Sequence, residues 1–200
     1  MIRRVFPDPW VYLSQMKTDT RKMTTTFSVT QKDARLVELL AKTDHKTLAQ
    51  WAMLCTERFL QYFERQNPKD LRPRHAIESL QAWIDTGEFR MATIRKAALE
   101  SHAAARDVGE DTSARSAARA AGQAVATAHV PTHSIGAANY AVQAIYRSAD
   151  SANADALIAQ ERDWQYRRLL ELREASHHAL ENAPQLLSVS EVTSMPRTSV

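Results

Sequence analysis

Apolar residues recur every three or four positions along most of this chain, a spacing typical of α-helices with one buried face. The clearest stripe lies in a predicted helix over residues 45–66 and consists of Leu48, Trp51, Cys55, Phe59 and Phe63. Strand-like alternation of apolar and polar residues is confined to residues 26–29, which are too few to build a sheet. The pattern therefore predicts an all-α protein.

Capping residues and helix breakers set the bounds of the predicted helices. Thr30 is placed as an N-cap, Gly87 as a C-cap and Pro131 as a breaker. Thr47 with Gln50 fits a capping box, which would start the second helix a few residues later. The predicted helices span residues 30–42, 45–66, 73–85, 89–107, 112–130, 132–149 and 153–172. Their sequences do not recur at a fixed period, so we expect a single compact bundle of about six to seven helices rather than a repeat array.

Both ends of the chain lack the helical period. Residues 1–29 contain prolines and a run of threonines and are predicted to form a flexible leader. Residues 173–200 are interrupted by serines, threonines and a proline and are predicted to form a flexible tail. The expected organisation is thus one all-helical domain over residues 30–172 between two disordered termini. Met23, upstream of the first predicted helix, is a candidate for the true start of translation.

The predicted helix over residues 112–130 is paved with small side chains. The members that share one helical face are Ala118, Ala121, Gly122, Val125 and Ala128. A face of this kind lets a second helix approach closely. We therefore expect a tightly packed helical core.

The positive charge of the chain is unevenly distributed. The formal net charge is +3, but residues 1–30 hold five of the 26 basic and only two of the 23 acidic residues. The predicted domain is therefore balanced in charge, which argues against nucleic-acid binding and against wholesale mimicry of a nucleic acid. The basic leader keeps a scaffold or DNA-associated regulator open as a further hypothesis.

No stretch approaches the roughly 20 apolar residues of a membrane span. The N-terminal Met1-Ile2-Arg3-Arg4 is followed by prolines rather than by an apolar segment, so it does not fit a secretory signal. We expect a cytoplasmic protein without a membrane partner.

Three histidines offer the best case for a metal site. His129 and His133 are four residues apart and His102 lies upstream. Two ligands at that spacing need a continuous helix, which Pro131 interrupts. The structural alternative is that His129 satisfies the C-terminal end of a helix. A small metal-binding protein or enzyme that uses His102, His129 and His133 remains the alternative function.

Arginines near the predicted helix ends are candidates for structural or partner contacts. They are Arg72, Arg74, Arg106 and Arg119. A guanidinium group there can tie loops together through forked hydrogen bonds or bind a partner, and both roles stay open. The carboxylates of Glu78, Glu100, Asp107 and Glu161 cannot be paired from the sequence. Neither a GxSxG elbow nor a glycine-rich phosphate loop is present, so no enzyme, no catalytic residue, no metal and no cofactor is predicted.

Residues from about Asp44 to Leu172 carry an ordered set of short motifs. They are LAQWA at 48–52, Cys55, FE at 63–64, PKDLRPR at 68–74, AIE at 76–78, AW at 82–83, AAAR at 103–106, AARAAGQAVATAHV at 117–130, AANYA at 137–141 and ERDWQ at 161–165. In this order the set resembles the Imm-5-like family of bacterial immunity proteins. Each motif alone is weak because alanine-rich helices look alike.

The resemblance implies a non-enzymatic protein that binds and neutralises a cognate toxin encoded beside it. It also implies a mostly helical fold, in agreement with the apolar pattern. It carries over no catalytic residues. The residues that it singles out, as partner-binding or structural, are Arg72, Arg74, Arg106, Arg119, Gly122, His129 and Tyr140. The toxin, the interface and the oligomeric state are not specified by the sequence.

Overall fold

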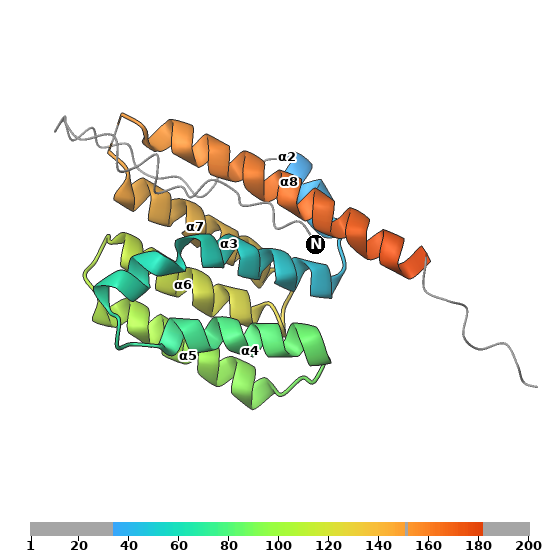
Figure 1. The fold of residues 1–200 in the computed structure, drawn as a ribbon, viewed down its shortest axis with the longest axis horizontal. Coiled ribbons are helices and arrows are strands. Elements are labelled where there is room, and N and C mark those ends of the chain that lie inside the picture. Colours follow the sequence, from blue (N-terminus) through green and yellow to red (C-terminus); the bar gives the residue numbers. More distant parts are fainter. Residues whose placement is uncertain (1–33, 151, 182–200) are drawn as a thin grey trace, which may run out of the picture.

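A computed structural model describes residues 34–150 and 152–181, and this part of the chain folds into a bundle of α-helices without strands (Figure 1). The all-α prediction is thus confirmed. The helices are α2 (Ala34–Ala41), α3 (His45–Gln66), α4 (Arg72–Thr86), α5 (Met91–Asp107), α6 (Ser113–Ala126), α7 (His133–Ser148) and α8 (Ala154–Glu181). The leader over residues 1–29, the Thr30 cap and residues 26–29 lie outside the described residues.

The ends of α3 and α4 follow from local capping chemistry. Asp44 is the N-cap of α3, and its carboxylate accepts a hydrogen bond from the Thr47 backbone N–H at 2.9 Å. The later start suggested by Thr47 and Gln50 is therefore wrong. Gly87 ends α4 in the left-handed conformation with φ of 73° and donates its N–H to the Trp83 carbonyl.

Two helices differ from their predicted lengths by more than two residues at the C-terminal end. The α6 helix ends at Ala126, not at residue 130, and Thr127 to His129 form turns before Pro131. The Thr127 carbonyl is engaged there by the His45 ring, which replaces a helical partner. The α8 helix continues past Leu172 to Glu181, so residues 173–181 are helical rather than part of an irregular tail. The helix breakers of that region come only later in the sequence, from Pro184 onwards.

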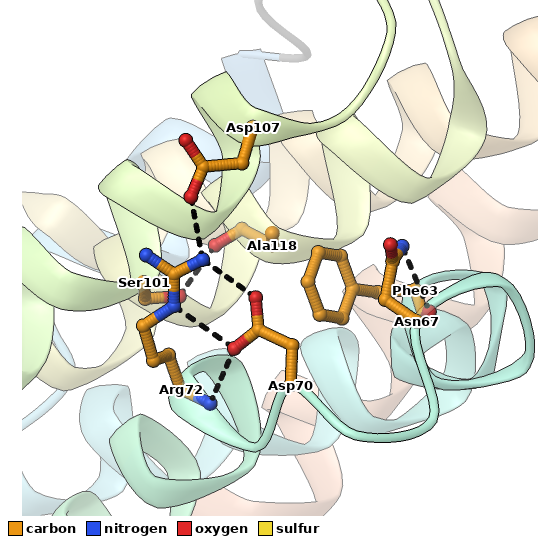
Figure 2. Close-up of polar contacts among 7 residues, drawn as sticks. All are labelled: Phe63, Asn67, Asp70, Arg72, Ser101, Asp107 and Ala118. Carbon is orange, nitrogen blue, oxygen red and sulfur yellow. Dashed lines mark hydrogen bonds and ion pairs between the residues drawn. The ribbon is translucent and has the colours of Figure 1, made fainter.

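The alanine-rich α6 lies at the centre of the bundle. It packs against α3, α4, α5 and α7, and most of its side chains are buried. Ser101 of α5 donates its hydroxyl to the Ala118 carbonyl of α6 at 2.7 Å, which shows how near the two backbones lie (Figure 2). The close packing predicted from the small residues is therefore present.

The long α8 closes the bundle by packing on α3 and α7 (Figure 1). Trp51 of α3 is fully buried beneath it and donates its indole N–H to the Gln165 carbonyl at 2.8 Å. Gln165 is also fully buried, and its amide donates to the Ala138 carbonyl of α7. Hydrogen bonds thus link α3, α7 and α8 within an otherwise apolar interface.

Candidate functional site

Arg72 is held in place by carboxylates at the beginning of α4 (Figure 2). Its Nε and Nη2 donate to the two oxygens of Asp70 at 2.9 and 2.6 Å. Nη2 also donates to Asp107, at the end of α5, at 2.6 Å. The two carboxylates raise the pKa of the guanidinium further above its usual range. Arg72 therefore ties the loop before α4 to the end of α5.

Arg74 makes a similar tie to α3. Its Nη2 lies 2.6 Å from Glu64 and its Nη1 lies 3.8 Å from Glu57. Both carboxylates belong to the C-terminal half of α3. Among the predicted site residues, Arg72 and Arg74 thus hold the junction of α3, α4 and α5 together.

Arg106 and Arg119 have different surroundings. Arg106 is exposed near the end of α5, and Arg119 is half-buried in the middle of α6. Within residues 34–150 and 152–181, neither guanidinium has a hydrogen bond or an ion pair. Both charges act on His102, because together with burial, the largest cause, they lower the pKa of that imidazole.

Gly122 provides the room that His102 occupies. A Cβ atom placed on Gly122 would lie 2.7 to 3.0 Å from three atoms of the His102 ring. No real side chain fits at that distance unless the ring moves, so Gly122 lets the imidazole of α5 lie directly over the α6 backbone. The Nδ1 atom of His102 is buried and has no hydrogen-bond partner in the described part of the chain.

His133 and His129 lie where the turn after α6 leads into α7, and His133 is near enough to His102 for its charge to contribute to lowering the pKa of His102. The Nδ1 atom of His133 lies 2.7 Å from the side-chain oxygen of Gln123, which in turn packs against Gly136. The His129 and His133 rings are 5.2 Å apart and tilted. Nδ1 of His129 is buried and unpartnered among the described residues. Burial and the neighbouring His129 lower the pKa of His133.

The three histidines are not arranged as a metal centre. No three His, Cys, Asp or Glu side chains in the described ranges are placed so that they could hold a metal ion. The helical geometry needed by His129 and His133 is broken, because α6 ends before one and α7 begins at the other. The alternative function built on His102, His129 and His133 thus has no support as a metal site.

Tyr140 lies on the stripe of α7 that follows α6. On this stripe, His133 and Gly136 contact Gln123, whereas Gln143 and Arg147 contact Ser116. The half-buried Tyr140 falls between these two contacts, so the register places it opposite Arg119. The charges of Arg106, Arg119 and His133 all act on His102, which lies over Gly122, and His129 lies beside His133. With Tyr140 opposite Arg119, these residues gather on one side of the bundle. We call the surface formed by His102, Arg106, Arg119, Gln123, His133 and Tyr140 the α5–α6–α7 face.

Glu161 is a buried carboxylate whose partner the sequence did not reveal. It is 3% exposed on α8 and lies 3.1 Å from the Arg58 guanidinium of α3, which also covers the Trp164 ring. Gln165, one turn later, donates to its other oxygen. Burial raises the pKa of Glu161 to about 7. The spacing of Glu161 and Gln165 places them on one helical face, but only the fold brings Arg58 to them.

Cys55 is fully buried below this cluster. Burial, with the Glu161 charge as a second cause, raises the pKa of its thiol well above the usual range. A thiol of this kind is not available as a nucleophilic thiolate.

Comparison with protein families gives one finding for this chain. A family model described as "Imm-5 like putative immunity protein" matches residues 38–172. The matched range runs from α2 into α8 and includes all of the site residues described above. Searches among curated proteins and among solved structures found no match. Among the described residues, none of the helices is long and apolar enough to cross a membrane.

Proposed function

Because the chain belongs to the Imm-5-like family of immunity proteins, we propose that it binds a toxin protein encoded beside it and neutralises the toxin by occlusion, without catalysis. Membership in the family is the observation that carries this proposal, and it bears out the resemblance noted in the sequence. A family of immunity proteins implies a toxin as partner in general. Co-expression with the neighbouring gene, described below, is the experiment that would identify the toxin.

The proposed contact surface is the α5–α6–α7 face. Arg106 and Arg119 are free to meet a partner there, whereas Arg72 and Arg74 are engaged in ion pairs within the bundle. The face is carried by packed helices, and its backbone is fixed by the buried α6. A surface already ordered before binding loses little conformational entropy on association, which favours tight occlusion.

Co-expression with the neighbouring gene product tests the function. We expect the toxin alone to stop growth and the pair to restore it, with both proteins eluting as one complex. A matched negative control is Leu60→Asp, which places a carboxylate at a fully buried position and should prevent folding. Toxicity that persists despite soluble co-expression would overturn the proposal.

Titration of the purified toxin separates binding from catalysis. A neutralising binder inhibits in proportion to its molar amount, so half an equivalent should leave about half of the toxin activity. If a small fraction of an equivalent abolished the activity over time, the protein would be acting as an enzyme.

A further inference from the structure

The α5–α6–α7 face carries positive charge without internal compensation. Neither α6 nor α7 contains an aspartate or a glutamate. The acidic residues closest along the chain are each paired with another cation: Glu100 with Lys96, Asp107 with Arg72, Glu110 with Arg115 and Asp111 with Arg147. Arg106 and Arg119 therefore keep their full hydrogen-bonding capacity, five N–H donors each.

His102 lies within reach of the field of both guanidinium groups. Its ring is fixed over Gly122, one turn of α6 beyond Arg119, and Arg106 follows one turn later on α5. The buried and unpartnered Nδ1 atom costs free energy in the isolated protein, because a buried polar atom without a partner loses its hydration. No hydrogen bond in the described bundle offsets this cost, and an anion bound beside the ring would offset it by stabilising the protonated imidazole.

We infer that Arg106, His102 and Arg119 form a receptor for a side-chain carboxylate of the toxin. The inference rests on the function proposed above, which makes the occupant a protein. A carboxylate accepts forked hydrogen bonds from a guanidinium, and a positive cluster with few acidic neighbours favours an acidic partner surface. Tyr140 and Gln123 lie beside the cluster and offer further polar contacts on the same face.

Charge reversal tests this receptor. The variant carrying Arg106→Glu and Arg119→Glu should bind the neighbouring gene's toxin at least 100-fold more weakly, on the order of the loss seen when a buried interfacial charge pair is broken. The matched control carries Lys46→Glu and Lys69→Glu, the same change of net charge at two exposed lysines that do not belong to the face. The control should bind within about threefold of the wild type. Since neither arginine has an intramolecular partner, both double variants should unfold at similar temperatures.

Arg119→Lys keeps the charge and removes the fork, and provides a second measure if the double reversal fails to fold. We expect a loss of about tenfold in toxin affinity for this variant. If the wild type binds the toxin and Arg119→Lys and the double reversal bind equally well, the receptor assignment is wrong and the proposed function stands. If the wild type binds no neighbouring gene product, both fall.

The His102 ring reports directly on the occupant. A bound carboxylate stabilises the imidazolium, so the pKa of His102 measured by NMR should rise in the complex, with His102→Gln used to assign the signal. The pKa of His102 is also measured after inorganic phosphate is added to the free protein, which tests whether the site binds a small anion. A His102 shift with phosphate but none with toxin would assign the site to a small anion and overturn the inference.

Discussion

Two pairs of arginines in the same set of motifs have opposite surroundings. Arg72 and Arg74 meet carboxylates of α3, α5 and the loop before α4 at 2.6 Å. Arg106 and Arg119, on α5 and α6, meet no carboxylate in the described part of the molecule. The first pair has its counter-charges within the fold, and for the second pair we propose a partner as their source. On this proposal, arginines of one motif set divide into those that stabilise the fold and those that bind a partner, according to whether a counter-charge lies beside them in the bundle.

Arg58 extends this comparison into the core. It forms an ion pair with the buried Glu161, and this ion pair lies in a region of low dielectric constant. A raised pKa in the folded state means that the folded protein binds more protons than the unfolded chain between about pH 4.5 and about pH 7. The stability that protonated Glu161 contributes to the fold is therefore fully present below about pH 4.5 and is lost as the pH rises to about 7.

The largest expected effect concerns the ion pair of Arg58 and Glu161. Wild-type protein should lose about 3 kcal/mol of unfolding free energy from the Glu161 contribution between pH 4.5 and 7, relative to Glu161→Gln, which cannot titrate. The measurement is urea unfolding of both proteins across this range. Taking the difference removes His102 and His133, whose lowered pKa values act in the opposite direction. Equal pH slopes for the two proteins would show that Glu161 titrates normally.

The next effect concerns the position of His102. Gly122→Ala should destabilise the wild type by about 1 kcal/mol, because crowding of the His102 ring outweighs the gain in helix propensity. In the His102→Ala background the same substitution should stabilise by up to about 1 kcal/mol, since only the propensity gain remains. Thermal or urea unfolding of the four proteins gives the coupling. Additive effects would mean that Gly122 does not make room for the ring.

Removal of a fold-tying arginine should cost less. Arg72→Ala should lower the unfolding free energy by about 0.5–1 kcal/mol, reduced from the value for a buried pair because Asp107 is largely exposed. Arg72→Lys should recover part of that loss, since it keeps a charge without the fork. Toxin affinity should be unchanged in both. A loss of toxin binding at full stability would place Arg72 in the interface and break the comparison.

The smallest effect is expected at the unpaired arginines. Arg106→Ala and Arg119→Ala should each change the unfolding free energy by less than about 0.5 kcal/mol, as is usual for surface sites without intramolecular partners. Urea unfolding of these two variants is measured in parallel with that of Arg72→Ala. Losses as large as that of Arg72→Ala would reveal a structural role that the bundle does not display.

The helices were largely predictable because each depends on local chemistry. The stripe from Leu48 to Phe63 and the Gly87 cap act over a few residues, so periodicity and capping rules find them. The end of α6 was missed because the His45 ring, far away in sequence, engages the Thr127 carbonyl. The end of α8 was missed because serines and threonines farther along were given weight over a stretch that is helical up to Glu181.

The sequence predicted which residues belong to the candidate site. It did not predict that some of the arginines pair with carboxylates of the bundle and that others, in the described part of the chain, do not. Pro131 correctly argued against a helical pair of histidine ligands, and Gly122 correctly indicated a close approach. Whether Arg72 or Arg106 would find a carboxylate depends on which helix ends meet, for example that α5 ends beside Asp70. Contacts of this kind join residues far apart along the chain, and no local pattern encodes them.

The most direct test of the account is a paired measurement on Arg119→Ala and Arg74→Ala. For each variant, the dissociation constant of the complex with the neighbouring gene's toxin is measured beside the unfolding free energy of the isolated chain. We expect Arg119→Ala to weaken toxin binding by about tenfold or more at unchanged stability. We expect Arg74→Ala to be destabilised and to bind as the wild type does. The reverse pattern, with binding lost in Arg74→Ala and stability lost in Arg119→Ala, would contradict the account.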